Sequence, residues 1–316
     1  MKGENKMKKV YLGLVLLSGL VLGTACSPSI VSQEETTKAT EVAVEKKESI
    51  QLVEEKVVSE RKTEIPASIV LPVDTSKEVP LVVLAHGFMG SRDEAGGFTE
   101  VSEKLAENGI ASIRIDFPGC NESTEPTTAY SMKNNTDDVM SAINYMKENY
   151  KINSDKIGML GYSMGGRITS LVSKEIELDT IVLWAPLISK TWEGTLEGEL
   201  LNNKLTEATK SGESTIEFFG NDISISLDLL QDLNNDQSLL NISEYKGNAL
   251  LITGGKDNVV LPSVTDNVAD KLGQVANFET ITLDNVGHGM GIYEEDRESQ
   301  NKLVESSSDF FVNYLK

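Results

Sequence analysis

The sequence predicts an α/β fold with a mostly parallel sheet that is covered by helices on both faces. Short segments that are almost entirely apolar recur along the chain, as is typical of strands buried on both faces. Segments with apolar residues at helical spacing alternate with them, and this alternation indicates a parallel sheet with crossover helices. With 316 residues, of which 39% are hydrophobic, the chain can form one large domain with appendages.

Each expected element has its own signal in the sequence. Continuous apolar runs predict buried strands at 80–85, 110–117, 156–161, 180–184, 249–253 and 278–283. Loosely alternating segments rich in Val and Ile predict edge strands at 50–61 and 64–73. Apolar residues three and four positions apart predict helices at 98–108, 132–150, 165–175, 262–272 and 296–315. The domain is therefore expected to span residues 50–316.

The alternation stops over residues 187–246, which are polar and contain Trp192, Phe218 and Phe219. A segment of this length is too long to connect two neighbouring strands, so we expect an inserted cap or lid. A helical insertion that does not contact substrate is the alternative.

Residues 1–26 have the form of a signal peptide. Four lysines precede an uncharged run over residues 10–25, which is short for a membrane-spanning helix. Small residues stand directly before Cys26, and the segment resembles a bacterial lipoprotein signal, whose cysteine becomes the lipidated N-terminus. The resemblance implies a protein anchored outside the cytoplasm through Cys26. Ordinary secretion or an uncleaved anchor are the alternatives.

Composition limits the partners of the chain. Residues 27–49 are rich in Ser, Thr, Glu and Lys, which predicts a flexible tether. The formal net charge of −20 argues against nucleic acid as a partner, because an acidic surface repels phosphate. It favours a neutral or cationic substrate, unless the acidity serves solubility alone. The cysteines and histidines show no zinc or redox spacing, so we expect no metal or cofactor.

The expected strand at 156–161 runs into Gly-x-Ser-x-Gly at 161–165. Small residues two positions from a serine allow a sharp strand-to-helix turn that holds the hydroxyl clear of the sheet. Ser163 is therefore the candidate nucleophile. A serine hydroxyl needs a base, and the chain contains two histidines. Because His288 follows the last expected strand, it is the candidate base, and we expect His86 to be structural.

An imidazole base needs an acid that fixes its tautomer and stabilises its cation. Asp257 follows the preceding expected strand and is the first candidate, while Asp284 and Asp222 compete with it. The order Ser163, Asp257, His288 places each residue at the carboxyl end of an expected strand, where open α/β sheets carry their sites.

This set of motifs resembles the α/β-hydrolase family over residues 50–316. The resemblance implies an eight-stranded, mostly parallel sheet and acyl-transfer chemistry. It also implies an oxyanion hole formed by the backbone N–H groups of Met164, which follows the nucleophile, and of Phe88, in the loop after the strand at 80–85. The imidazole of His86 is expected to order this loop.

Within that family, the motifs at 86–90, 116–119 and 161–166 most resemble bacterial cinnamoyl and feruloyl esterases and related serine carboxylesterases. The resemblance implies hydrolysis of small-molecule esters with a short-chain or aromatic acyl group. Trp192, Phe218 and Phe219 are the candidate walls of its pocket.

Three points stay open at this stage. Where those esterases usually carry Gly-His-Gly-x-Ser, residues 119–123 contain Cys120, which we expect to be an incidental thiol. A serine peptidase or acylaminoacyl peptidase of the same fold is the alternative enzyme. A catalytically silent, lipid-anchored binding protein is the alternative from another class.

Replacing Cys26 by serine removes the thiol that would carry the lipid. We therefore expect full-length Cys26→Ser protein to leave the membrane fraction of expressing bacteria and the detergent phase in phase partition. The Cys120→Ser variant is the matched control and should stay with the membrane. Retention of Cys26→Ser protein in the membrane fraction contradicts the lipid anchor.

Overall fold

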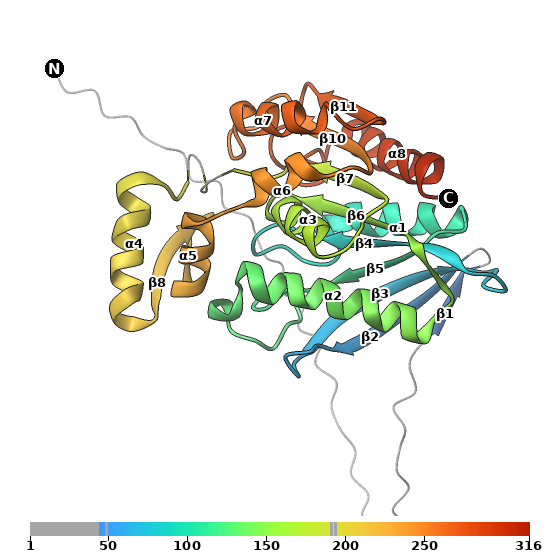
Figure 1. Ribbon diagram of the computed structural model, residues 1–316, viewed down its shortest axis with the longest axis horizontal. Coiled ribbons are helices and arrows are strands. Elements are labelled where there is room, and N and C mark those ends of the chain that lie inside the picture. Colours follow the sequence, from blue (N-terminus) through green and yellow to red (C-terminus); the bar gives the residue numbers. More distant parts are fainter. Residues whose placement is uncertain (1–43, 48–49, 190–191, 193–194) are drawn as a thin grey trace, which may run out of the picture. The chain divides into compact units, whose positions relative to one another are not determined.

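The computed structural model describes residues 44–47, 50–189, 192 and 195–316 (Figure 1). The expected signal peptide, its Cys26 and most of the expected tether lie outside these residues. The strands of the main sheet are β1 (Val44–Lys47), β2 (Ile50–Val58), β3 (Glu64–Pro72), β4 (Val79–Ala85), β5 (Ala111–Ile115), β6 (Ile152–Tyr162), β7 (Thr180–Trp184), β10 (Asn248–Gly254) and β11 (Phe278–Leu283). The helices around it are α1 (Gly97–Glu107), α2 (Met132–Asn149), α3 (Met164–Glu175), α7 (Pro262–Leu272) and α8 (Arg297–Tyr314).

Within the described residues, the main sheet has nine strands in the order β1-β2-β3-β5-β4-β6-β7-β10-β11. The strands from β5 to β11 in this order pair in parallel, whereas β1, β2 and β3 pair antiparallel. The expected eight-stranded, mostly parallel sheet is thus confirmed and carries β1 as an additional edge strand. Because parallel strands end at the same edge, the loops after β4, β6, β10 and β11 are brought together there.

The strand β1 lies inside the range expected to be tether, so the folded part begins earlier than expected. Val44 pairs with Val53 and Lys47 with Ile50, which satisfies backbone groups along the edge of β2. The segment of β1 reads Val-Glu-Lys-Lys, and it lacks the apolar alternation by which a strand is recognised in sequence.

Helices cover both faces of the sheet because successive strand residues point to opposite sides. In β4, Leu81 and Val83 belong to the core on the side of α2, α3 and α7. Val82 and Leu84 belong to the core on the side of α1 and α8. All four side chains are fully buried, as expected for a strand without a polar face. Among the described residues, no helix is both long and apolar enough to cross a membrane.

The segment between β7 and β10 contains more than helices. Its elements are α4 (Gly198–Ser211), β8 (Glu213–Phe218), β9 (Asn221–Ser226), α5 (Leu227–Asn234) and α6 (Ser238–Glu244). The strands β8 and β9 form an antiparallel hairpin with Phe218 opposite Asn221. Thr127, in the loop after β5, donates a hydrogen bond to the Ser224 carbonyl oxygen at 2.7 Å and so ties this loop to the hairpin. The role of the segment as a cap stays a prediction.

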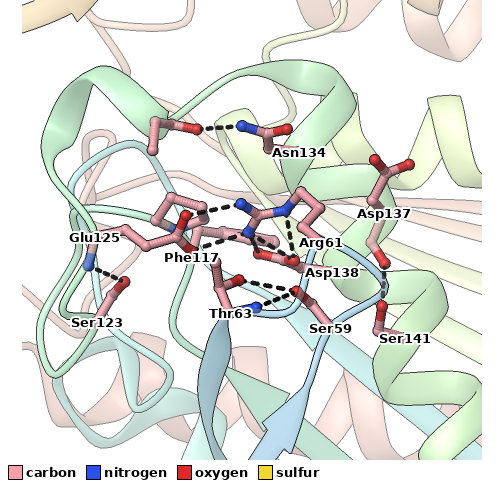
Figure 2. A network of polar contacts seen from close by, with 12 residues as sticks. Ser59, Arg61, Thr63, Phe117, Ser123, Glu125, Asn134, Asp137, Asp138 and Ser141 are labelled. Atoms are coloured by element: carbon pink, nitrogen blue, oxygen red, sulfur yellow. Dashed lines mark hydrogen bonds and ion pairs between the residues drawn. The ribbon is translucent and has the colours of Figure 1, made fainter.

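The loop after β5 is also held by Arg61, in the turn between β2 and β3 (Figure 2). The Arg61 guanidinium donates to both carboxylate oxygens of Glu125, at 2.7 and 2.9 Å. It also donates to Asp138 of α2 at 2.8 Å. Two parallel hydrogen bonds to one carboxylate fix both distance and orientation. Arg61 therefore joins the β2–β3 turn, the loop after β5 and α2.

Replacing Arg61 by alanine leaves the Asp138 carboxylate, whose side chain is 1% exposed, without its cation. We expect Arg61→Ala to lower the free energy of unfolding by about 3 kcal/mol, because a buried charge loses its partner. Urea unfolding followed by circular dichroism measures this loss. Lys56→Ala, which breaks an exposed ion pair with Glu64, is the control and should change stability little. Equal effects of the two variants contradict the assignment.

Candidate active site

Ser163 occupies the turn between β6 and α3 with φ 52° and ψ −115°. A positive φ is unfavourable for a residue with a side chain, so the surroundings must hold this conformation. The Ser163 N–H donates to the Trp184 carbonyl oxygen at 2.9 Å. The Ser163 carbonyl oxygen accepts from the N–H groups of Gly166 at 3.0 Å and Leu187 at 2.9 Å. The turn is thus anchored on both sides of its strained residue.

The two glycines of the motif are required by close contacts. A Cβ atom on Gly161 would overlap the Gly165 carbonyl oxygen, and one on Gly165 would overlap the Ala85 carbonyl oxygen. Gly165 therefore lets the start of α3 approach the end of β4. This approach brings the nucleophile turn next to the loop that follows β4.

The structure brings Ser163, His288 and Asp257 into one hydrogen-bonded chain. The Nε2 atom of His288 lies 2.9 Å from Ser163 Oγ, and Nδ1 lies 2.8 Å from Asp257 Oδ2. The other carboxylate oxygen of Asp257 accepts from the N–H groups of Val259 and Val260, both at 2.9 Å. These bonds hold the carboxylate in place, so we assign the Nδ1 proton to the Asp257 side and leave Nε2 to accept from Ser163.

The competing acids lie elsewhere. Asp284 and Asp222 are exposed, and neither makes a hydrogen bond to His288. Cys120 is buried, and this burial raises the pKa of its thiol to about 12. The thiol therefore stays protonated at neutral pH, and Cys120 is absent from the cavity wall beside Ser163.

The loop after β4, residues 86–90, is here called the oxyanion loop because the sequence places a candidate oxyanion donor in it. The Gly87 carbonyl oxygen accepts from His86 Nδ1 at 2.7 Å and from the Gly90 N–H at 3.0 Å. Because a trans peptide holds its C=O and N–H in opposite directions, these bonds also fix the direction of the Phe88 N–H. In the described part of the chain, neither the Phe88 nor the Met164 N–H has an acceptor. Both are free to receive an oxygen atom.

His86 has the structural role that the sequence indicates. Its Nε2 atom accepts the Phe117 N–H at 3.0 Å, so the imidazole joins the oxyanion loop to the loop after β5. The side chain is fully buried, and the loss of solvation lowers its pKa to about 4. His86 is therefore neutral at physiological pH. A neutral imidazole donates with one nitrogen and accepts with the other, which agrees with its two hydrogen bonds.

Four polar residues of the site were not identified from the sequence: Tyr162, Glu94, Tyr293 and Glu294. The Tyr162 hydroxyl donates to the His288 carbonyl oxygen at 2.9 Å. Buried Glu94 accepts from the Gly87 N–H at 2.7 Å and from the Tyr293 hydroxyl. Glu294 accepts from the backbone N–H groups of Gly287 at 3.0 Å and Gly291 at 2.7 Å.

Ser163 and His288 open into a cavity of about 520 Å³. Phe88, Trp192 and Phe218, which line it, meet in edge-to-face and tilted contacts with ring centroids 5.0–5.7 Å apart. Phe219 also lines the cavity, but it is 76% exposed and lies at the tip of the β8–β9 hairpin. Thus buried Phe88 and Trp192 form an aromatic wall together with partly buried Phe218. No group of three or more His, Cys, Asp or Glu side chains in the described ranges is arranged to hold a metal ion.

Two family models match the chain. The model described as the alpha/beta hydrolase fold matches residues 80–176, which contain the oxyanion loop and Ser163. The model described as the C terminal of BAAT / acyl-CoA thioester hydrolase matches residues 140–292, which contain Ser163, Asp257 and His288.

Similar proteins include esterases. The chain is 28% identical over 127 residues to Esterase EstD of Thermotoga maritima, covering 39% of this chain and 30% of the relative. It is 34% identical over 92 residues to an uncharacterized 31.7 kDa protein of Escherichia coli, covering 28% of this chain and 30% of the relative. The alignments thus span less than a third of these curated relatives. They support the prediction of a carboxylesterase-type hydrolase.

Solved structures agree with the observed architecture. The structure of Est1E from Butyrivibrio proteoclasticus with bound ferulic acid superimposes with a TM-score of 0.67 at 15% identity. The superposition covers 82% of this chain and 98% of that protein. A likeness at this level of identity establishes architecture and leaves specificity open. Together with the strand order and the turn at Ser163, these matches show that the chain has the α/β-hydrolase fold.

Proposed function

We propose that this protein is a serine carboxylesterase that cleaves esters of short-chain or aromatic acyl groups through an acyl-enzyme intermediate. The observation that carries the proposal is the hydrogen-bonded chain from Asp257 through His288 to Ser163, which ends at the wall of a cavity. A serine in such a chain is an activated nucleophile, because the imidazole accepts its proton as the new bond forms.

The proposed reaction has two halves. Ser163 Oγ attacks the ester carbonyl carbon while His288 Nε2 takes its proton, and the carboxylate of Asp257 stabilises the resulting imidazolium. The negatively charged oxygen of the tetrahedral intermediate accepts from the N–H groups of Phe88 and Met164. His288 then returns the proton to the departing alcohol and leaves an acyl group on Ser163. A water molecule, deprotonated by His288, releases the acid and restores the serine.

The aromatic wall supports an acyl pocket beside the nucleophile. Phe88, Trp192 and Phe218 pack edge to face and line the cavity, so they offer an aromatic surface to a flat acyl group. The Trp192 indole N–H is buried and has no acceptor among the described residues, which favours an acyl group that carries an oxygen atom. A hydroxycinnamoyl group has both properties, and Est1E, one of the structural neighbours, was solved with ferulic acid.

Hydrolysis of acyl-CoA thioesters is the second candidate, because the thioester hydrolase model matches residues 140–292. The same nucleophile and oxyanion donors would serve a thioester. The charges of the cavity favour the ester, however. Its described lining residues include the carboxylates of Glu94 and Glu294 and no lysine or arginine, whereas coenzyme A carries several phosphate charges.

We also propose that the enzyme acts outside the cytoplasm, held at a membrane by a lipid on Cys26. This proposal rests on the N-terminal sequence, with its lysines, short apolar run and small residues before the cysteine. The residues between Cys26 and β1 would then link the catalytic domain to the lipid.

Replacing Ser163 by alanine tests the catalytic proposal. We expect kcat for p-nitrophenyl acetate and butyrate to fall at least about 10⁴-fold, because the attacking oxygen is lost. Ser154→Ala, at an exposed position of the same strand, is the matched control and should keep the wild-type rate. Equal rates for wild type and Ser163→Ala would remove the catalytic claim. A butyryl-CoA hydrolysis rate above that of butyrate esters would favour the thioesterase.

Replacing Phe218 by alanine tests the acyl pocket. We expect kcat/KM for methyl ferulate to fall about tenfold, because the flat acyl group loses one aromatic wall. The value for p-nitrophenyl acetate should change little, since an acetyl group is too small to reach that wall. Leu240→Ala, at an exposed position of α6 outside the cavity wall, is the control. A parallel loss for both esters would assign Phe218 to general stability, and hydrolysis of aminoacyl nitroanilides in place of esters would favour a peptidase.

A further inference from the structure

We propose that Glu94 is a positioning residue that locks the oxyanion loop to the loop that carries His288. This role rests on the proposed esterase function and assigns a residue that takes no part in the hydrogen-bonded chain of Ser163. The loop that carries His288, residues 284–294, is called the base loop below.

The carboxylate of Glu94 lies between the two loops and has one partner in each. One oxygen accepts the Gly87 N–H at 2.7 Å, and the other accepts the Tyr293 hydroxyl. Glu94 is fully buried, and its backbone φ is 42°. Such a φ is unfavourable for any residue other than glycine. A Cβ atom on Gly90 would lie 2.5 Å from Glu94 Oε1, so the oxyanion loop is shaped around this carboxylate.

Tyr293, which donates to Glu94, is connected to His288 through neighbouring residues of the base loop and through Tyr162. Tyr293 precedes Glu294, whose carboxylate accepts the N–H groups of Gly287 and Gly291 on the two sides of His288. The Tyr293 ring also stacks with Tyr162, at 6.5 Å and 23°. Tyr162 in turn donates to the His288 carbonyl oxygen. A shift of Tyr293 therefore moves the segment that carries the base.

The contact to Gly87 acts on the oxyanion donor. Bonding to Glu94 removes the Gly87 N–H as a donor to substrate and fixes one side of the Gly87 residue. The bonds to the Gly87 carbonyl fix the other side, so the next N–H, that of Phe88, has one direction available. Oxyanion donors act by being in place before charge develops on the substrate oxygen. Loss of Glu94 should therefore reduce kcat more than it raises KM.

The protonation state of Glu94 gives the role a measurable signature. Burial raises the pKa of its carboxyl to about 7, although the bonds from Tyr293 and Gly87 oppose that rise. As a carboxylate it accepts from both loops. When protonated it presents a donor at one oxygen, which disrupts one of the two contacts. Activity should therefore fall as pH falls through about 7, in addition to any loss caused by protonation of the base.

The tyrosines and the cysteine around Glu94 do not imitate this titration. Tyr293, Tyr162, Tyr130 and Cys120 face it from the neighbouring loops and strands, and burial raises the pKa of each above its ordinary value. These groups stay neutral between pH 5 and 9. The ionisable residues that share the cavity wall with Glu94 are His288 and Glu294, and His288 is required as an unprotonated base.

The first experiment compares Glu94→Gln and Glu94→Ala with wild type on p-nitrophenyl butyrate. We expect kcat to fall about 100-fold in Glu94→Ala, with KM nearly unchanged, because an oxyanion donor is displaced. Glutamine, like the protonated carboxyl, presents a donor at one of the two positions, so Glu94→Gln should recover only part of this loss. The acid limb of log(kcat/KM) against pH should be steeper in wild type than in Glu94→Gln, because only the wild type has a Glu94 carboxyl that titrates. Glu107→Gln, on the exposed end of α1, is the matched control.

The second experiment uses Tyr293→Phe, a change at a half-exposed side chain that spares the fold. The Tyr293 hydroxyl stabilises the Glu94 carboxylate, so its removal should raise the pKa of Glu94 and move the acid limb to higher pH. In the double variant with Glu94→Gln this shift should vanish. Tyr314→Phe removes an exposed hydrogen bond from the last residue of α8 to Glu279 of β11; it is the control and should leave the profile unchanged.

The outcomes separate this role from the esterase proposal. If wild type hydrolyses the ester and Ser163→Ala does not, the esterase proposal stands whatever Glu94 does. The role of Glu94 is overturned if Glu94→Gln keeps the wild-type slope, or if Tyr293→Phe shifts the profile equally with and without Glu94. A rise in KM at unchanged kcat in Glu94→Ala would also overturn it, because that pattern belongs to substrate binding.

Discussion

The strained turn at Ser163 is the constraint on which the rest of the site depends. Its positive φ persists because the backbone groups of the turn bond to β7 and to the loop beyond it, and because Gly165 allows α3 to lie against the end of β4. That approach sets the place of the oxyanion loop relative to the nucleophile. Asp257 and His288 must also lie next to Ser163. They do so because they follow β10 and β11, which pair in parallel and end at the same edge of the sheet.

Hydrogen bonds from polar side chains tie the loops at this edge to one another and to α2. His86 ties the oxyanion loop to the loop after β5, and Arg61 ties that second loop to α2. Glu94 ties the oxyanion loop to the base loop. Loops contribute few apolar contacts, so hydrogen bonds that would be costly to break supply the rigidity that a preorganised site requires. This division explains why so many charged residues are buried near an otherwise apolar cavity.

The sequence was sufficient to predict the sheet and to select Ser163 and His288, which the structure brings into hydrogen-bonding distance, because these have local patterns or few competitors. Buried strands appear as apolar runs, and two histidines leave little choice for a base. Glu94 and Tyr293 could not be found in this way, since their contact joins residues 199 positions apart and neither belongs to a periodic pattern. The strand β1 and the β8–β9 hairpin were missed for a related reason. The β1 segment has no apolar alternation. In the hairpin, Ile216 and Ile225 alternate with polar residues and lie in the core, but its strands are short and the surrounding segment is polar.

In the proposed reaction, Phe88 connects the choice of acyl group to the chemistry of its transfer. Its ring forms part of the aromatic wall with Trp192 and Phe218, while its backbone N–H is the proposed oxyanion donor. An acyl group that presses on the ring therefore acts on the residue whose N–H must meet the oxyanion. Contacts of this kind change in strength between ground state and transition state, so they affect kcat as well as binding. Specificity in this enzyme should accordingly be set where the β8–β9 hairpin meets the oxyanion loop, two segments 130 residues apart in sequence that the fold brings into contact.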